Sequence, residues 1–299
     1  MRIFKFGGAS VKDAPSVKNV ASVLQQVGYE DVLIIVSAMG KTTNALEEIV
    51  ATYQNNPAQL KTAIQALEAF HLNIVSALMG ENSTELEDKV RKLIGEMLSF
   101  FEHNKSPNYS FVYDQTVSFG ELISTTIICD YLRSVGLPAH WLDARSCVKT
   151  DSYYRDANLD WELTQSKIKE QVNGAKLIIS QGFIGSDSNN FTTTLGREGS
   201  DYTAAIFGYA LGAELVTIWK DVPGVLNGDP RHFEDTVLLN QISYREAIEL
   251  AFYGASVIHP KTLQPLQRKE IPLYVRSFVS PECKGTAVSK GQTLSLIHI

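Results

Sequence analysis

Residues 195–201, LGREGSD, lie between an expected strand at 176–181 and an expected apolar helix at 202–211. A glycine-rich turn that leads into a helix leaves backbone N–H groups without partners, beside the positive end of the helix dipole. Arg197 adds a guanidinium that can bind a carboxylate or phosphate through two parallel hydrogen bonds, and Asp201 stands at the expected helix N-cap. The stretch predicts an anion-binding turn with a carboxylate beside it. The alternative is an ordinary helix cap whose charged side chains face solvent.

A second glycine-rich strand end occurs at residues 4–10, FKFGGAS. Lys5 lies inside an apolar run between two phenylalanines, and a buried lysine is costly unless it has an anionic partner. Gly7 and Gly8 then end the strand. Two glycine-bearing strand ends with complementary charges therefore predict one shared phosphate site.

The composition is that of a soluble globular protein. With 299 residues, 44% hydrophobic and 20% charged, the chain can bury one large core or two lobes. The net charge of -6 comes without a run of Lys and Arg, so neither a nucleic acid nor a membrane is an expected partner. The three cysteines lack CxxC spacing, which disfavours a zinc site or a disulfide framework. No secretory segment and no long apolar run is evident, and we expect a cytoplasmic protein.

The order of the expected elements indicates an α/β fold. A strand at 2–6, a helix at 13–28 and a continuous apolar strand at 31–37 form a strand-helix-strand unit, which favours a parallel sheet covered on both faces. Residues 42–103 keep an apolar spacing of three to four and are expected to contain at least three helices. Further strands are expected at 140–143, 176–181, 214–219 and 272–278, and further helices at 161–172, 202–211 and 243–253, from 119 and from 259.

The residue pattern favours phosphoryl transfer to an anion. The sequence contains neither GxxxxGK[ST] nor GxGxxG, and no Ser/His/Asp arrangement or histidine cluster is evident. Lys5 with the two glycines can neutralise a transferring phosphoryl group. A carboxylate acceptor is already ionised at neutral pH, so the remaining task is to overcome the repulsion between two anions with Lys, Arg, helix N-termini and Mg²⁺. No protein ligand set is expected for the metal, because phosphates and water can hold it.

Three features allow both a functional and a structural interpretation. Glu121 stands at an expected helix start, where it can bind a substrate ammonium group or serve as an ordinary first-turn acid. Residues 219–231 follow a strand and can form a nucleotide pocket or a surface loop. Asp201 can orient Lys5 or another lysine, or it can simply cap its helix.

Six motifs in chain order carry a resemblance to a known family. The motifs are KFGGAS, VSAMGKTTNAL, SFGELIST, TTTLGREGSDYTA, WKDVPGVLNGDPR and GASVIHPKTLQPL. They resemble the catalytic domain of aspartate kinases, which are members of the amino acid kinase family. The resemblance implies a three-layer α/β/α sandwich around a mainly parallel sheet, with residues 1–200 as an N-terminal lobe for the amino acid and 201–299 as a C-terminal lobe for ATP. It implies transfer of the γ-phosphoryl of MgATP to the β-carboxylate of L-aspartate, the first step of lysine, threonine and methionine biosynthesis.

The resemblance also implies roles for individual residues. Lys5 would stabilise the transferring phosphoryl group, and Asp201 would organise the lysines. The aspartate pocket would use Glu121 for the α-amino group and Arg197 for the α-carboxylate, together with Ser37 and Thr43. The phosphates would be lined by Gly7, Gly8 and Ser10, and the nucleotide side would be formed by Lys220, Asp221, Leu226 and Arg231.

The sequence departs from the family pattern at several positions. Family members often carry Thr at the position of Ala9, Tyr at that of Leu226 and a phosphate-binding Lys at that of Ser256. We therefore expect Lys261, five residues later, or Lys220 to supply the missing charge beside the nucleotide. Either lysine can instead be a solvated surface residue.

The resemblance leaves alternatives for the acceptor and for turnover. The acceptor in such a fold can also be glutamate, acetylglutamate, carbamate or a nucleoside monophosphate, although Glu121 favours a free amino group. A nucleotide or amino-acid sensor without turnover is a further alternative. The resemblance implies a homodimer. Family members usually continue into regulatory domains, which we do not expect in the residues after Thr286, so an isolated or truncated catalytic domain is expected.

Overall fold

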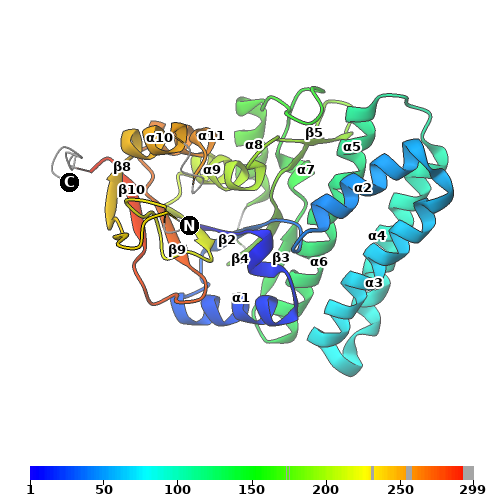
Figure 1. Ribbon diagram of the computed structural model, residues 1–299, viewed down its shortest axis with the longest axis horizontal. Helices are drawn as coiled ribbons and strands as arrows, with labels where there is room; N and C mark the ends of the chain where they lie inside the picture. Colours follow the sequence, from blue (N-terminus) through cyan, green and yellow to red (C-terminus); the bar gives the residue numbers. More distant parts are fainter. Residues whose placement is uncertain (173, 175, 230–231, 254–257, 292–299) are drawn as a thin grey trace.

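One eight-stranded sheet runs through the protein in the computed structural model, which describes residues 1–172, 174, 176–229, 232–253 and 258–291 (Figure 1). Its strand order is β3-β4-β2-β1-β7-β9-β10-β8. The first six strands of this order run in parallel, whereas β10 is antiparallel to β9 and parallel to β8. The strands are β1 (Arg2–Phe6), β2 (Val32–Val36), β3 (Ala139–Leu142), β4 (Leu177–Gln181), β7 (Leu215–Lys220), β8 (Gln241–Ser243), β9 (Leu273–Ser277) and β10 (Thr286–Ser289).

The central strands are apolar over almost their whole length because both faces of the sheet are covered. All five residues of β2 are buried. In β1, Phe4 and Phe6 pack on Trp219 of β7, with ring centroids 5.8 and 6.0 Å apart. Lys5 is the one charged residue in the buried part of β1, opposite Ile35 on one side and Ile218 on the other.

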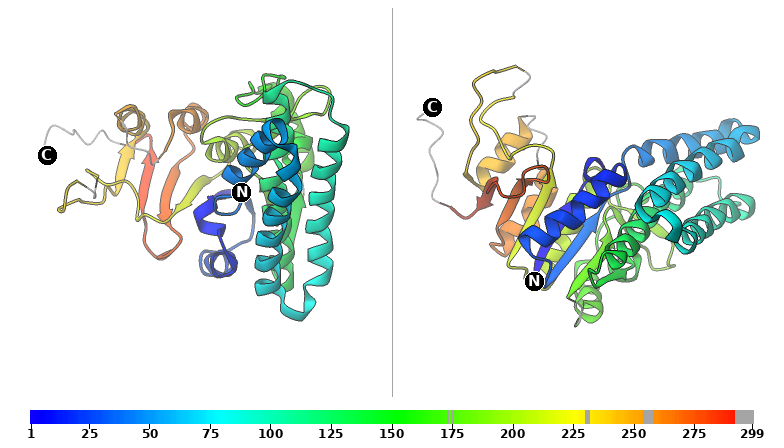
Figure 2. Two further views of the ribbon diagram at one scale, coloured as in Figure 1. Left: turned by 45° about the vertical axis from the view of Figure 1, so that its right-hand side comes forward. Right: turned by 90° about the horizontal axis from the view of Figure 1, so that it is seen from below.

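Helices form a layer on each face of the sheet (Figures 1 and 2). Helix α9 (Gly199–Leu211) packs on β1, β2 and β7, with α8 (Trp161–Gln171) and α11 (Pro260–Arg268) beside it. Helix α10 (Tyr244–Phe252) packs against α11, and the short α7 (Ala144–Cys147) against α8. Helices α1 (Ala14–Val27) and α6 (Phe119–Ser134) lie on the opposite face. The predicted three-layer α/β/α sandwich is confirmed.

Four more helices form an arm beside the sheet, at the end far from β8 and β10 (Figure 1). They are α2 (Thr42–Asn55), α3 (Leu60–Met79), α4 (Thr84–His103) and α5 (Tyr109–Val117). The segment around α3 is long and apolar enough to cross a membrane by length and composition alone. A single such helix is weak evidence, since core helices of soluble proteins meet the same test. Here α3 packs against α2, α4 and α6.

Several segments differ from the sequence-based expectation, which did not include the short elements α7, β8 and β10. Residues 109–117 lie between the expected helices at 42–103 and from 119 and form α5, which begins where the Asn108 side chain accepts hydrogen bonds from two backbone N–H groups. A small antiparallel hairpin, β5 (Ile184–Ser186) and β6 (Thr192–Thr194), separates β4 from the LGREGSD turn. Strands of three residues leave too short a pattern to recognise in a sequence.

The expected N-cap position of Asp201 is wrong. Helix α9 begins at Gly199, and Glu198 occupies the N-cap position with a left-handed φ of 55° and no side-chain cap hydrogen bond. Asp201 therefore lies inside the first turn, where its carboxylate pairs with Lys5 instead of the backbone.

Replacing Ile34 by alanine should lower the free energy of unfolding by about 2–5 kcal/mol, because the side chain is fully buried in β2 at the centre of the sheet. Urea denaturation followed by tryptophan fluorescence measures the loss. Leu163→Ala on α8 is the control, since that side chain is 44% exposed, and it should change the stability far less. Equal losses in the two variants would contradict this account of the core.

Candidate active site

A cavity of about 400 Å³ opens near the carboxyl ends of the central strands. Lys5 on β1 and Ser37, directly after β2, both line it, and ligands bind at this edge in open α/β sheets. The cavity brings together Lys5 and all four residues predicted for the amino acid. The lining residues are Lys5, Ser37, Thr43, Tyr113, Glu121, Arg155, Phe183, Gly196, Arg197, Glu198, Gly199 and Ser200.

A buried ion pair forms the innermost part of this site. The Lys5 ammonium lies 2.5 Å from one oxygen of Asp201, and the two side chains are only 9% and 1% exposed. Asp201 sits in the first turn of α9, where the helix dipole also favours a negative charge. Lys220, the last residue of β7, places its ammonium 3.9 Å from the other Asp201 oxygen. Asp201 thus lies between two lysines.

Glu121 contributes a buried carboxylate with one unsatisfied oxygen. Its Oε1 accepts a hydrogen bond from the Ala38 backbone N–H at 3.1 Å. Its Oε2 has no hydrogen-bond partner among the described residues. Burial raises the pKa of Glu121 to about 8, and the Ala38 N–H and the Lys5 charge offset only part of that rise. Such a carboxylate is suited to receive a cationic group from a ligand in the cavity.

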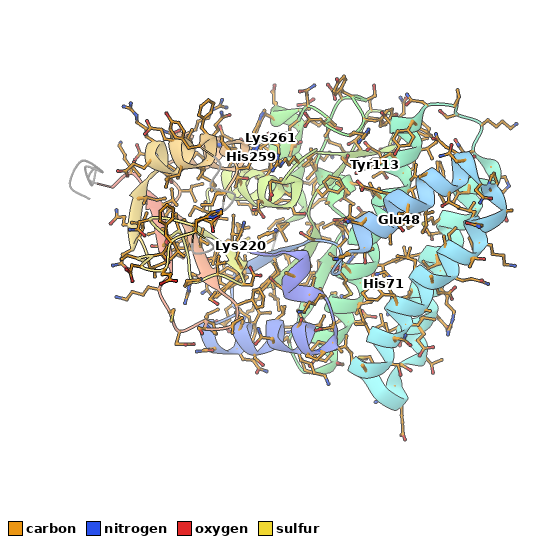
Figure 3. The ribbon with its side chains drawn as sticks, viewed as in Figure 1. Glu48, His71, Tyr113, Lys220, His259 and Lys261 are labelled. Carbon is orange, nitrogen blue, oxygen red and sulfur yellow. The ribbon has the colours of Figure 1, made fainter. Side chains whose placement is uncertain are left out.

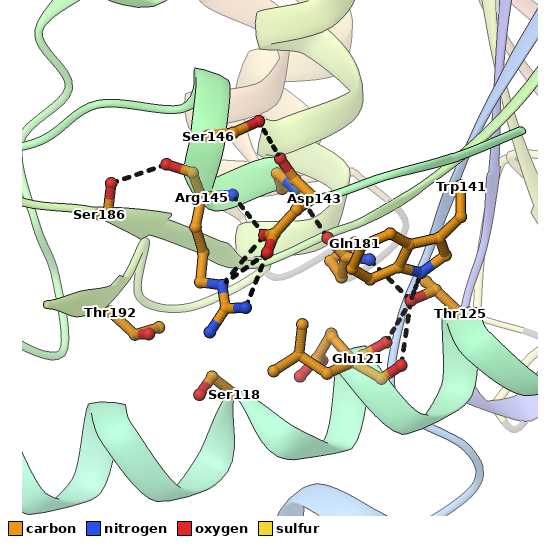
Figure 4. A network of polar contacts seen from close by, with 12 residues as sticks. Ser118, Glu121, Thr125, Trp141, Asp143, Arg145, Ser146, Gln181, Ser186 and Thr192 are labelled. Carbon is orange, nitrogen blue, oxygen red and sulfur yellow. Dashed lines mark hydrogen bonds and ion pairs between the residues drawn. The ribbon is translucent and has the colours of Figure 1, made fainter. Parts of the chain in front are cut away.

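Hydrogen bonds hold the helical turn that carries Glu121 (Figure 4). Thr125 donates to the Glu121 carbonyl at 2.8 Å. The Thr125 hydroxyl accepts from Gln181 of β4 at 2.7 Å and from Trp141 of β3 at 3.0 Å. The first turns of α6 are therefore fixed to two neighbouring strands, which positions the backbone from which the Glu121 side chain extends.

The predicted phosphate-lining residues lie at the end of β1. A Cβ atom on Gly8 would come within 2.9 Å of the carbonyl oxygens of Ala38 and Gly40, so no side chain fits there without a shift of the backbone. A Cβ on Gly7 would lie 3.3 Å from the Lys5 ammonium nitrogen. The Ser10 hydroxyl donates to the Trp219 carbonyl at 3.4 Å and ties this turn to β7.

The LGREGSD turn packs closely against its neighbours. Gly196 has a φ of 74°, and a Cβ there would come within 2.4 Å of the Asp156 carboxylate. A Cβ on Gly199 would come within 2.7 Å of the Phe183 ring. The backbone is therefore held in place while the side chain of Arg197, between these glycines, stays exposed and lines the cavity.

Lys261 lies in the first turn of α11, and its ammonium is held by two acceptors. It forms an ion pair with Asp156 at 2.8 Å and donates to the Leu195 carbonyl at 2.9 Å. The same ammonium lies 5.0 Å from the centre of the Tyr202 ring. Figure 3 labels Lys261 on α11 and Lys220 on β7.

The remaining nucleotide-side predictions fall in the segment after β7. Asp221 is exposed and directly follows that strand. Leu226 forms an antiparallel bridge with Leu238. Arg231 and Ser256 lie outside the described residues.

Several residues of the cavity were not predicted from the sequence, above all Arg155, Tyr113 and Phe183. Arg155 comes from a polar stretch without a recognisable motif, and Tyr113 from α5, where no helix was predicted. Both residues are brought to the cavity by contacts between segments that lie far apart in the sequence. The buried Asp114 carboxylate, for example, accepts hydrogen bonds from the backbone N–H groups of Arg155 and Thr194.

Comparison with known proteins identifies the family. The sequence model of the amino acid kinase family matches residues 1–277. The chain belongs to the amino acid kinase family. Lysine-sensitive aspartokinase 3 of Escherichia coli (strain K12) is 34% identical to this kinase-family chain over 291 residues, covering 96% of the chain and 63% of that protein. The chloroplastic aspartokinase 1 of Arabidopsis thaliana is 32% identical, with 98% of the chain and 52% of that protein covered.

A solved structure gives the same result for the fold. The crystal structure of Escherichia coli aspartokinase III in complex with aspartate and ADP superimposes with a TM-score of 0.90 at 32% identity, covering 98% of this amino acid kinase chain and 65% of that chain. A bifunctional chloroplastic aspartokinase/homoserine dehydrogenase of Arabidopsis thaliana matches 96% of the chain over 32% of its own length. The chain thus spans between a third and about two thirds of the length of these relatives.

Replacing Glu121 by glutamine should change how the stability of this amino acid kinase depends on pH. Because the folded pKa of about 8 lies above the ordinary 4.5, the native state holds a proton between these values that the unfolded state has released. Stability of the wild type therefore falls as pH rises through this window. The variant should lose that contribution, so its melting temperature relative to wild type should increase from pH 5 to pH 8.

The control for this comparison is Glu162→Gln on the exposed surface of α8. Its melting temperature relative to wild type should stay nearly constant over the same range. A constant difference for Glu121→Gln as well would mean that the buried carboxyl does not titrate as described.

Proposed function

We propose that this protein is an aspartate kinase domain, which transfers the γ-phosphoryl group of ATP to the β-carboxylate of L-aspartate and yields 4-phospho-L-aspartate. The observation that carries the proposal is the unsatisfied, buried Glu121 oxygen in a cavity whose lining also includes the cations of Lys5 and Arg197. A substrate with one ammonium and two carboxylates complements this set. The product would enter lysine, threonine and methionine biosynthesis.

Each charged group of aspartate has a proposed partner. The Glu121 carboxylate would bind the α-ammonium, and Arg197 would bind the α-carboxylate through two parallel hydrogen bonds. Ser37, directly after β2, and Thr43, in the first turn of α2, would add neutral hydrogen bonds. The β-carboxylate would then lie toward Lys5, which is buried deep in the site, whereas Arg197 is exposed at the rim.

The chemical step would rest on electrostatic stabilisation, because the β-carboxylate is itself the nucleophile and needs no base. Its oxygen forms the new bond to the γ-phosphorus, and the bond from that phosphorus to the bridging oxygen of ADP breaks. Lys5 would neutralise charge on the transferring group, and Asp201 would hold Lys5 and Lys220 in position. The phosphates would lie along Gly7, Gly8 and Ser10, with the rest of the nucleotide beside Asp221, Leu226 and Arg231.

Family members often carry a phosphate-binding lysine at the position of Ser256, and Lys220 or Lys261 could supply that charge here. Lys220 is the better supported of the two. Its ammonium shares the Asp201 carboxylate with Lys5, so it would lie beside the proposed position of the phosphoryl group. The predicted phosphate-binding role of Lys261 requires its ammonium to leave Asp156 and the Leu195 carbonyl. Replacing either lysine by alanine tests its role in turnover.

The described residues include no group of three or more His, Cys, Asp or Glu side chains that could hold a metal ion. Asp201 already faces two lysines. Magnesium would arrive with ATP, held by phosphate oxygens and water, and no step above is assigned to it. We further propose a cytoplasmic homodimer with an amino-acid lobe at 1–200 and a nucleotide lobe at 201–299.

The decisive experiment is ADP release with MgATP and each of L-aspartate, L-glutamate, N-acetyl-L-glutamate and UMP, with hydroxylamine present to trap an acyl phosphate. Turnover with L-aspartate and formation of its hydroxamate are expected. Lys5→Met should lower kcat by about 10²–10³ because it removes charge stabilisation from the reacting groups. Lys18→Met, at an exposed position of α1, is the control and should leave kcat unchanged.

Other outcomes of this experiment would contradict the proposal. Turnover with another acceptor would overturn the substrate assignment, and ATP binding without any turnover would indicate a sensor. An unchanged kcat in Lys5→Met would remove Lys5 from the mechanism.

Aspartate binding should release protons near pH 7. With its pKa near 8, Glu121 is mostly protonated in the empty site, and it must ionise to pair with the substrate ammonium. Calorimetry in buffers of different ionisation enthalpy should detect nearly one proton released, and binding should tighten as pH rises toward 8. Binding to Glu121→Gln should be weaker and should release no proton. Equal proton release by the two proteins would contradict the assignment of Glu121.

A further inference from the structure

Arg155 presents a guanidinium at the rim of the cavity. The residue is exposed and lines the cavity together with Arg197. Its guanidinium carbon lies 4.7 Å from the centre of the Tyr113 ring and 5.6 Å from that of Tyr109, both on α5. Contact with two aromatic faces restricts the side chain while leaving the N–H donors at its edge available to a ligand.

The guanidinium of Arg155 makes no hydrogen bond or ion pair with an acidic side chain in the described part of the chain, although its charge offsets part of the rise that burial causes in the pKa of Asp114. The hydrogen bonds and ion pairs found there involve only its backbone N–H, which donates to both oxygens of the buried Asp114 at 3.1 Å. Arginine is suited to bind a carboxylate through two parallel hydrogen bonds. An anion in the cavity could therefore bind Arg155 without displacing a protein acceptor.

The backbone of Arg155 adopts a conformation that residues other than glycine rarely adopt. Its φ is 74°, in the left-handed region. Such a conformation costs free energy and persists where the surroundings impose it, often at binding sites. Here the Asp114 carboxylate imposes it by holding Arg155 N–H and also the backbone N–H and hydroxyl of Thr194.

Lys261 ties the segment that carries Arg155 to the turn that carries Arg197. Its ammonium contacts Asp156, the residue after Arg155, and the Leu195 carbonyl, two residues before Arg197. The two segments also touch at Gly196, where a Cβ would lie 3.3 Å from the Arg155 carbonyl oxygen. The two arginines are thus placed on adjoining segments of one rim.

We propose that Arg155 is a second specificity-determining guanidinium, which binds the α-carboxylate of the amino acid substrate together with Arg197. The ligand assignment rests on the proposed aspartate kinase function. The carboxylate that accepts the phosphoryl group must reach the buried Lys5, so the other carboxylate is the one that lies at the exposed rim. Lys261 acts as a positioning residue, because it contacts the two segments rather than the substrate.

The test compares ligands that differ only in one carboxylate. Calorimetry would measure Kd for L-aspartate, for its α-carboxamide and for L-asparagine, the β-carboxamide, with wild type and Arg155→Gln. The variant should bind L-aspartate and L-asparagine at least about tenfold more weakly, because each loses a charge-assisted contact at its α-carboxylate. Binding of the α-carboxamide, which lacks that carboxylate, should change less than about threefold. The Kd of Arg155→Lys for L-aspartate should lie between those of the wild type and of Arg155→Gln.

Arg91→Gln on the surface of α4 is the matched control and should bind all three ligands like wild type. In turnover assays Arg155→Gln should raise KM for L-aspartate while leaving kcat and the KM for ATP within about twofold. A similar loss of affinity for all three ligands would overturn the proposal, since it would indicate a general structural effect. So would unchanged binding of L-aspartate.

The same experiment separates this inference from the proposed function. Suppose that the wild type phosphorylates L-aspartate, and that Arg155→Gln changes the Kd of all three ligands by the same factor. That result would overturn the inference alone. Wild type that binds L-aspartate with the expected dependence on Arg155 but does not phosphorylate it would overturn the kinase activity alone. Failure of wild type to bind L-aspartate would overturn both.

Discussion

The ion pair between Lys5 and Asp201 is the constraint on which the site depends. A lysine in the central strand of a covered sheet cannot stay charged without an anion beside it, and α9 supplies that anion from its first turn. This pairing fixes the start of α9 against β1. Because the LGREGSD turn leads directly into α9, the same contact also sets where Arg197 meets the cavity. Sheet, helix and rim are therefore positioned by one interaction.

Glu121 stands in contrast to Asp201. Both carboxylates are buried, but Asp201 faces two ammonium groups, whereas one Glu121 oxygen has no partner among the described residues. The polar network around Thr125 holds the helical turn from which the Glu121 side chain extends. An unsatisfied buried acid lowers the stability of the empty protein, and a cationic ligand group would remove that cost. Under the proposed function, preorganisation of this kind would make the cavity selective for a substrate with a free amino group.

The sequence predicted the features that rest on local patterns. The buried strand β2 is a continuous apolar run, β1 is an apolar run interrupted by Lys5, and the turns after β1 and before α9 are recognisable by their glycines. Lys5, Glu121 and Arg197 were identified because charged residues at strand ends and helix starts are informative. Arg155 was not, because its place depends on Asp114, which is remote in sequence and buried only after folding. The predicted N-cap of α9 at Asp201 was wrong because the ion pair between Asp201 and Lys5 joins segments that are distant in the sequence.

The strand order also affects how the chain acquires its structure during synthesis. β1 is made first, yet one of its two neighbours, β7, and the partner of Lys5 are made only after β2, β3 and β4. Lys5 has no partner until α9 is made, and the second edge of β1 stays open until β7 is made. Pairings between segments so far apart in sequence close slowly. The growing chain therefore carries an unpaired apolar strand edge and an unpaired lysine until α9 and β7 dock on β1.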